Sequence, residues 1–263
     1  MPEIWRLLQD EAAEGAWNMA VDEAMARAVG AGCVPSTLRF YTWARPTLSL
    51  GYLQSARILD TPLCQRLGLA AVRRPTGGRA VIHHHELTWS LALPLDSAWG
   101  RLSVPERFRR IARGLVEGLR CLGVAAAVGE AAPRVAANTR PAACFRLRGM
   151  PAILSQGRKL GGAAERRWER TVLQHGSLLL DFDPALHAAI FPDWEAAEQE
   201  VTWLTRILRP CPDLEAVRAA LGTGLAGLAG VELQGGALSL GETEEAGRLV
   251  AAKYGSPTWT AGR

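Results

Sequence analysis

The chain has 263 residues, of which 48% are hydrophobic, and a formal net charge of +4. This length is enough to bury a substantial core, and we interpret it as one domain. Its longest apolar stretches fall far short of the roughly 20 apolar residues that a bilayer span needs, which excludes a membrane-spanning helix. The five cysteines are an odd number without a CxxC pair, so they indicate neither a disulfide framework nor a zinc site.

Residues 1–10 contain Glu3, Arg6 and Asp10 and lack the apolar core and small-residue cleavage site of a secretory signal. Free thiols are the simpler interpretation of the cysteines, and they suit a reducing compartment. We therefore expect a cytoplasmic protein.

The first third of the chain alternates helical and extended patterns. Residues 16–29 place apolar side chains at the spacing of an amphipathic helix. Extended segments are expected at 37–43, 47–52, 69–74, 79–85 and 87–95. The first two are separated at Arg45-Pro46, because proline restricts the residue before it to extended conformations. The last two are nearly contiguous, so they form either a tight hairpin or one long bent strand.

A helix that Pro105 opens keeps the 3.6-residue period as far as Gly123. Strands are expected at 124–128, at 159–167 and 171–181 as a hairpin, and at 231–238. Helices are expected at 184–191, 194–208 and 212–228, and a last one is capped at Thr243 and runs to Tyr254. Hairpins with peripheral helices predict an α+β fold, in which residues 1–263 form one domain and a mainly helical segment from about 184 packs onto it.

Three glycine-marked turns are the candidate binding elements. In residues 73–83, RRPTGGRAVIH, paired glycines allow close backbone approach to a ligand and arginines can pair with carboxylate or phosphate groups. The spacing fits neither a P-loop nor a GxGxxG motif, and a plain tight turn between strands is the alternative. Residues 157–164, GRKLGGAA, and 173–178, LQHGSL, have the same character. Three such turns in one domain suggest a ligand that several loops hold.

The basic residues are unusual in type and placement. Lys159 and Lys253 are the only lysines among 30 basic residues, and arginine cannot lose its proton, so a retained lysine suggests an amine that must. Residues 134–170 hold nine basic side chains against two acidic ones, a net +7, which leaves −3 for the rest of the +4 chain. Such a patch would steer an acidic partner, although a solvated arginine-rich face would have the same composition.

The order of these motifs resembles the biotin and lipoate protein ligase superfamily, and most closely the LipM-type octanoyltransferases. The resemblance covers nearly the whole chain, from residues 17–23 (WNMAVDE) to Lys253-Tyr254, and includes Glu86-Leu87-Thr88. It implies the ligase-like catalytic domain, with mixed sheets flanked by helices. It also implies transfer of octanoate from an acidic acyl carrier protein to the lysine of a lipoyl domain. Acceptors of that kind are glycine cleavage protein H and the acyltransferase subunit of a 2-oxoacid dehydrogenase.

By that likeness Cys144 stands at the position of the nucleophilic cysteine and Lys159 at that of the catalytic lysine. A thiol with a pKa of about 8.5 is only a few per cent thiolate at neutral pH, so it needs a nearby cation or base. Beside an apolar acyl tunnel and near Arg158, the Lys159 amine would lose its proton readily and take one from Cys144 or from the acceptor lysine. A thioester conserves the activation of the donor, so neither ATP nor a metal is expected.

The remaining expected substrate contacts are Arg74, Thr76, Gly77, Gly78, Arg79, His83, Gly161, Gly162, His175 and Gly176. The four glycines in the first two turns offer backbone amides to the thioester oxyanion. His83 is placed in the acyl pocket, whereas His175 either lines the site or is structural. Strand neighbours alternate faces, so only His83 and His85 could share a metal, and none is expected. Burial of about six octanoyl methylenes would contribute roughly 5 kcal/mol.

The chain departs from this family at Ala163 and Glu165, where relatives commonly carry Ser and Gln, and at residues 151–154, where they carry a Tyr-Glu pair. These changes concern donor specificity and hydrogen bonds around the site, and they leave both residues of the dyad in place.

Three alternatives differ in testable ways. An ATP-dependent lipoate ligase uses the same turns without a nucleophilic cysteine, so Cys144 and the lack of an obvious separate C-terminal domain argue against it. An amidotransferase between lipoyl domains also uses a cysteine thioester, and only a donor assay separates it. A nucleic-acid binder would interleave aromatic residues with the arginines, yet residues 134–170 offer only Phe145 and Trp168. We expect a monomer with no nucleic acid and no membrane partner.

Overall fold

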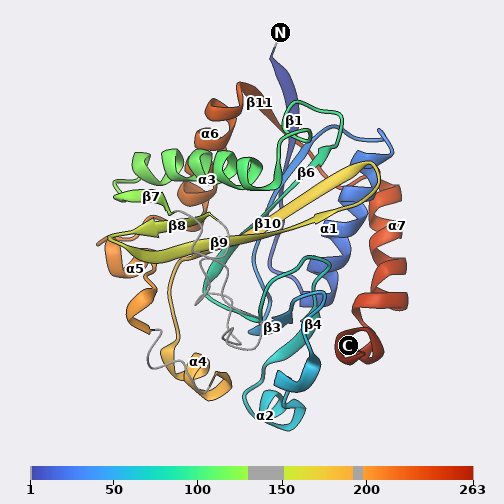
Figure 1. The fold of residues 1–263 in the computed structure, drawn as a ribbon, viewed down its shortest axis with the longest axis vertical. Helices are drawn as coiled ribbons and strands as arrows, with labels where there is room; N and C mark the ends of the chain where they lie inside the picture. Colours follow the sequence, from blue (N-terminus) through green and yellow to red (C-terminus); the bar gives the residue numbers. More distant parts are fainter. Residues whose placement is uncertain (1, 130–150, 192–197, 263) are drawn as a thin grey trace.

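The computed structural model describes residues 2–129, 151–191 and 198–262, and a large mixed sheet lies at its centre (Figure 1). Within those residues eight strands form this sheet: β1 (Glu3–Gln9), β2 (Thr37–Tyr41), β6 (Glu86–Pro94), β7 (Ala126–Gly129), β8 (Ala152–Ser155), β9 (Arg158–Arg167), β10 (Thr171–Leu179) and β11 (Val231–Gly235). Their spatial order is β11-β1-β2-β6-β10-β9-β8-β7. β1 is parallel to β11 and β2, and the other pairs are antiparallel.

A smaller sheet of the described strands has the order β4-β3-β5, with β3 (Thr47–Leu50), β4 (Ala70–Arg73) and β5 (Val81–His83). The prediction that residues 79–85 and 87–95 form a hairpin or one bent strand is wrong, because β5 pairs with β3 whereas β6 pairs with β2 and β10. Between them the chain turns at His84-His85, where the Glu86 amide donates to the His84 carbonyl at 3.1 Å. His83 and Glu86 thus lie where the chain passes from one sheet to the other.

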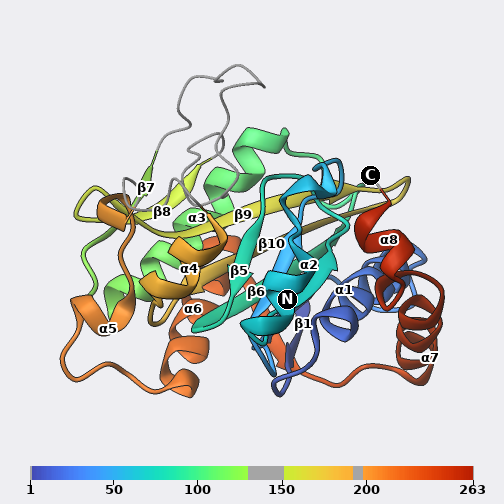
Figure 2. The same ribbon diagram turned by 90° about the horizontal axis from the view of Figure 1, so that it is seen from below.

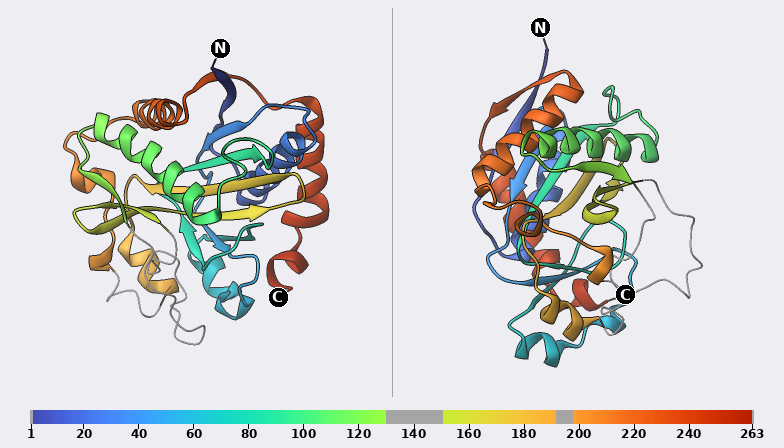
Figure 3. Two further views of the ribbon diagram at one scale, coloured as in Figure 1. Left: turned by 45° about the horizontal axis from the view of Figure 1, so that its top comes forward. Right: turned by 90° about the vertical axis from the view of Figure 1, so that its left-hand side faces the viewer.

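Helices cover both faces of the large sheet (Figure 3). They are α1 (Gly15–Gly30), α2 (Thr61–Arg66), α3 (Val104–Cys121), α4 (Pro184–Ile190), α5 (Leu204–Ile207), α6 (Leu214–Ala229), α7 (Leu240–Leu249) and α8 (Pro257–Ala261), with a π-helical turn at Val250–Tyr254. α3 and α6 pack against Trp5, Phe40 and Leu91 on one face. α1 covers the other face, α7 lies beside α1, and α8 packs against β4 (Figure 2).

The two helices predicted in the first half of the chain are confirmed as α1 and α3. The amphipathic character predicted for the first is wrong, because α1 is buried at every position from Asn18 to Ala26. The predicted hairpin at 159–167 and 171–181 is confirmed as β9 and β10. β10 is buried along its whole length, because it lies between two other strands and under helices on both faces. The site described below is built on this rigid central strand.

Two helix predictions are wrong. Within residues 194–208, of which 194–197 lie outside the described residues, the chain forms a 3₁₀ turn at Glu198–Glu200 and the short α5, and Val201 between them bridges to Lys159. The helix predicted to be capped at Thr243 is α7, which begins at Leu240 with Ser239 as its N-cap. The Ser239 hydroxyl accepts from the Glu242 amide at 3.2 Å, and the Glu242 carboxylate accepts from the Ser239 amide at 2.8 Å. This reciprocal capping box satisfies two amides that a start at Thr243 would leave open.

The fold is α+β, with mixed sheets flanked by helices, as predicted. β11 pairs with β1, so the segment beyond residue 184 adds a strand to the large sheet. None of the helices in the described ranges has the length and apolar character needed to cross a bilayer.

Candidate active site

A cavity lies between α1, the small sheet and the β9–β10 pair. β9 and β10 contribute Lys159, Gly162, Ala163, Ala164, His175, Gly176 and Ser177 to its lining. The rest of the lining is Met19, Tyr41, Trp43, Arg74, Val81, His83 and Thr88. The fold thus brings together six predicted site residues from three separate turns: Arg74, His83, Lys159, Gly162, His175 and Gly176.

The other predicted residues either are not among the described residues that line this cavity or lie outside the described residues. Thr76, Gly77, Gly78 and Arg79 belong to the turn between β4 and β5. Gly161 pairs with Leu178 in the β9–β10 ladder. Cys144 lies outside the described residues.

The two arginines of the first turn both donate to backbone carbonyls. Arg73 is fully buried and donates to the carbonyls of Gly51, Gln54 and Thr260 at 2.7 to 2.8 Å. Arg74 donates to the carbonyls of Gly77 and Arg79, each at 2.7 Å, and to the Ser49 hydroxyl at 3.0 Å. Arg74 therefore fixes the shape of the turn, whereas Arg73 ties the start of the turn to residues 51–54 and to α8.

Close backbone packing explains one glycine of this turn and one that the sequence reasoning did not single out. Gly78 has a φ of 97°, which side chains other than glycine rarely adopt. A Cβ on Gly51 would lie 2.0 Å from the Gly78 carbonyl oxygen. Both positions need glycine for the turn to pack against the end of β3.

His83 is held on both ring nitrogens. Its Nδ1 lies 2.7 Å from the Glu86 carboxylate and its Nε2 lies 2.7 Å from the Ser49 hydroxyl. The ring stacks on Trp43, with centroids 4.0 Å apart and planes at 11°. An ionised carboxylate can only accept, so Nδ1 carries a proton. His83 therefore has no ring nitrogen left over for a substrate.

His175 is also held by hydrogen bonds at both ring nitrogens, from residues of different elements. Its Nδ1 lies 3.1 Å from Asp22 of α1 and its Nε2 lies 2.6 Å from the Thr76 hydroxyl. Asp22 also accepts from Arg39, Tyr41 and Ser90 at 2.8 to 2.9 Å. The histidine thereby joins α1, β10 and the first glycine turn, which supports a positioning role.

Both buried carboxylates stay ionised although burial opposes it. Burial raises the pKa of Asp22, but the bond from His175 and the charge of Arg39 outweigh it, and the pKa lies below its ordinary value. The pKa of Glu86 is likewise lowered, because the charge and bond of His83 and the hydroxyls of Thr88 and Ser177 outweigh burial. Burial lowers the pKa of His175, so this imidazole is neutral at pH 7.

Among the described residues of the lining, Lys159 is the remaining basic side chain, and a strand irregularity sets its direction. In a regular strand, residues 159 and 162 would face opposite sides, since their separation is odd. The β8–β9 register shifts between Ile153 and Leu154, which indicates a bulge with one extra residue in β9. The extra residue puts Lys159 and Gly162 on the same face of the sheet. A Cβ on Gly162 would lie 2.9 Å from Lys159 Cε and 3.2 Å from Nζ. The buried amine therefore lies over the glycine at the cavity wall.

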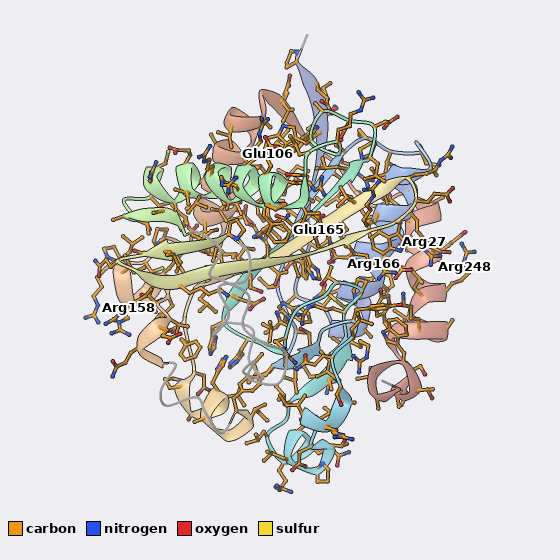
Figure 4. The ribbon with its side chains drawn as sticks, in the orientation of Figure 1. Arg27, Glu106, Arg158, Glu165, Arg166 and Arg248 are labelled. Carbon is orange, nitrogen blue, oxygen red and sulfur yellow. The ribbon has the colours of Figure 1, made fainter. Side chains whose placement is uncertain are left out.

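The described arginines of the predicted basic segment do not gather around Lys159. Arg158 points outward at one edge of the sheet, and Arg166 lies toward the other end of β9 (Figure 4). The Arg166 guanidinium lies 4.5 Å from the centre of the Tyr52 ring. Within the described part of residues 134–170, the basic side chains are therefore spread along the strand.

Glu165 forms a buried ion pair with Arg107 of α3. Arg107 Nε and Nη2 reach the two carboxylate oxygens at 2.8 and 2.7 Å, and Arg107 Nη1 donates to the carbonyls of Gly100 and Leu102. Gln174 donates to the same carboxylate at 3.2 Å. The departure at Glu165 thus concerns the anchoring of α3, whereas Ala163 borders the cavity.

Sequence reasoning gave no role to Asp22, Trp43, Glu86 or Ser177, which hold or line the site. The signal was present for the acids, because each interrupts an otherwise apolar element, and a buried carboxylate requires partners. The sequence could not predict those partners, because Asp22 and His175 are 153 positions apart in the chain. Among the described residues, no group of three or more His, Cys, Asp or Glu side chains is arranged to hold a metal ion.

Comparison with known proteins decides the family. The model of the lipoyl protein ligase A/B catalytic domain matches residues 14–226. The chain belongs to this family. It is 41% identical to the octanoyltransferase LipM of Symbiobacterium thermophilum, with 97% of each chain covered. It is also 41% identical to the LipM octanoyltransferase of Kyrpidia tusciae, with 98% of each covered. The predicted resemblance is confirmed over nearly the whole length.

Solved structures share the fold. A lipoate-protein ligase A bound with ATP superimposes with a TM-score of 0.84 at 25% identity, over 100% of this chain and 99% of the ligase. The putative lipoate protein ligase Ta0514 of T. acidophilum, with bound lipoic acid, gives a TM-score of 0.82 at 24% identity over the whole of both chains. At this identity the likeness supports the architecture, and the choice between transferase and ligase depends on the nearer relatives.

Proposed function

We propose that this chain is an octanoyltransferase of lipoate biosynthesis, which moves an octanoyl group from acyl carrier protein to the lysine of a lipoyl domain. The observation that carries the proposal is its 41% identity with LipM octanoyltransferases over almost all of both chains. The cavity is consistent with it, since Met19, Trp43 and Val81 offer apolar surface next to the amine of Lys159.

The proposed reaction passes through a thioester on Cys144. In the first half, the Cys144 sulfur attacks the donor thioester and the carrier thiol leaves. In the second half, the acceptor amine attacks the enzyme thioester and Cys144 leaves. Because both exchanges conserve the acyl activation, the reaction needs neither ATP nor a metal.

Lys159 is proposed as the base of both halves. His83 and His175 each have both ring nitrogens engaged, so neither is available to take a proton from a substrate. The ammonium form of Lys159 favours the thiolate, and its neutral form takes the proton of the acceptor lysine. The role of Cys144 itself rests on the family resemblance.

The partners follow from this chemistry. The donor is an acidic acyl carrier protein, and the acceptor is a lipoyl-domain protein such as glycine cleavage protein H or a 2-oxoacid dehydrogenase subunit. We propose that the chain acts as a monomer in the cytoplasm, where both partners would occur. An amidotransferase that moves the acyl group between lipoyl domains would use the same thioester.

The test is the intact mass of the full-length protein after incubation with octanoyl acyl carrier protein. We expect an added octanoyl mass that hydroxylamine removes, and Cys144→Ser should abolish the hydroxylamine-labile adduct. Replacing the carrier by an octanoylated lipoyl domain as donor tests the amidotransferase. Unchanged transfer by Cys144→Ala would contradict the thioester route.

An ATP-dependent lipoate ligase is the second candidate, because a ligase A bound with ATP shares the fold over the whole chain. That activity would require free lipoate or octanoate with ATP and would form no adduct on the protein. The same mass experiment, repeated with free octanoate with and without ATP, separates the two.

A further inference from the structure

Ser177 lies directly opposite Gly162 in the β9–β10 ladder, and both residues line the cavity. Paired residues in antiparallel strands have Cβ positions about 4.5 to 5.5 Å apart. The Lys159 side chain lies over Gly162. The Ser177 hydroxyl and the Lys159 amine therefore flank the same point of the cavity wall.

The Ser177 hydroxyl proton is already used. Ser177 Oγ donates to Glu86 Oε1 at 2.7 Å, and Glu86 is 2% exposed. The same oxygen accepts from Thr88 and His83, so the carboxylate is held in place from three sides. Because a carboxylate only accepts, Ser177 presents lone pairs and no proton to the cavity.

Thr88 and Ser177 both donate to Glu86, but they differ in what their own oxygens accept. Thr88 also lines the cavity and donates to Glu86 Oε1, at 2.6 Å. Its own oxygen, however, accepts from the Trp43 indole Nε1 at 2.7 Å. Of the two hydroxyls on this carboxylate, Ser177 is the one whose acceptor capacity stays open to a ligand. A hydroxyl polarised by a buried anion is a strong acceptor.

The proposed substrates contain one kind of group that fits such an acceptor. The acyl chain is apolar, and the thioester carbonyl is itself an acceptor that would be repelled. The attacking amine has N–H donors and gains positive charge as it attacks. We propose that Ser177, oriented by Glu86, accepts an N–H of the acceptor lysine and aims its nitrogen at the acyl carbon.

This inference rests on the transfer to lysine proposed above. In the step concerned, the amine nitrogen forms a bond to the acyl carbon, the carbon–sulfur bond of the enzyme thioester breaks, and the sulfur leaves as thiolate. The proton lost by the nitrogen passes to the Lys159 amine. Ser177 takes no proton, and its single contact holds the nitrogen in line while the charge develops.

The experiment follows the two half-reactions of Ser177→Ala separately, with full-length protein and intact mass spectrometry. Adduct formation from octanoyl acyl carrier protein should stay within about two-fold of the unaltered protein, because no amine takes part. Transfer of the octanoyl group from the adduct to a purified lipoyl domain should be slowed about ten-fold, which corresponds to the free energy of one hydrogen bond. Ser177→Thr keeps the hydroxyl and should restore most of the second rate.

Ser90→Ala is the matched control, since it deletes a hydroxyl that donates to the buried carboxylate of Asp22 at 2.8 Å and does not line the cavity. The ratio of its two rates should equal that of the unaltered protein. Equal slowing of both half-reactions by Ser177→Ala, or no slowing of the second, would overturn the inference. Failure of the proposed function looks different, because the unaltered protein would then form no adduct.

Discussion

The side chain of Lys159 lies over Gly162. In a regular strand a separation of three residues would place these two positions on opposite faces. The bulge beside Leu154 makes this possible, and the absence of a side chain at Gly162 leaves room for the amine. The pair therefore couples a backbone irregularity to the position of the only lysine in the cavity lining.

Gly162→Ala should lower kcat roughly ten- to hundred-fold while leaving the melting temperature nearly unchanged, because a catalytic group moved by about 1 Å loses productive geometry. The new Cβ would lie 2.9 Å from Lys159 Cε, and the flexible side chain would move away. Steady-state octanoyl transfer and thermal unfolding measure the two effects. Gly227→Ala is the control, since a Cβ there meets nothing within 4 Å. Full activity of Gly162→Ala would show that the amine has no fixed role.

Arginine at each of the two lysine positions tests the need for a group that can lose a proton. Lys159→Arg keeps the charge but cannot act as a base, so we expect acyl-adduct formation to fall at least about 100-fold. Lys253 pairs with Glu23 at 2.6 Å, and arginine can keep that pair, so Lys253→Arg should react at the rate of the unaltered protein. The time course of intact mass measures both. Equal rates for the two variants would exclude Lys159 as the base.

Glu165→Gln should destabilise this protein. Arg107 and Glu165 are 2% and 6% exposed at their side chains, so the change leaves a buried guanidinium without its counter-charge. We expect a loss of about 3 kcal/mol in the free energy of unfolding, measured with urea. Glu117→Gln removes an exposed pair with Arg120 and should change stability by less than about 0.5 kcal/mol. Equal stability of both variants would refute the role assigned to the buried pair.

Stability should decrease as the pH is lowered below neutrality, in part through His187. Burial lowers the pKa of His187 to about 4, so between about pH 4 and the unfolded value of about 6.5 the unfolded chain binds the extra proton. Unfolding free energy should therefore rise with pH across that window, by up to about 3 kcal/mol from this residue. Urea titrations at four pH values should show that the unfolding free energy of His187→Phe depends less steeply on pH than that of the unaltered protein. An unchanged slope would mean that His187 does not titrate in this range.

The sequence by itself determined the family, the fold class and most of the central elements. Periodicity located α1 and α3 because an apolar stripe at 3.6 residues is a local property, and alternation located the β9–β10 hairpin for the same reason. Motif order then predicted the ligase-like domain, which comparison with known proteins confirmed. The proposed dyad stays a prediction of the sequence, since Cys144 lies outside the described residues.

Only the tertiary structure decided how the site is held. It placed His83 and Glu86 in different sheets, joined Asp22 to His175 and Thr76, and turned Lys159 toward Gly162. Local periodicity carries no information on which strand a segment will pair with, because pairing depends on burial and hydrogen bonding across the whole chain. A one-residue bulge also reverses the side to which a strand residue points, and composition does not reveal it. The sequence therefore predicted which side chains form the site, whereas long-range packing determined how they are oriented.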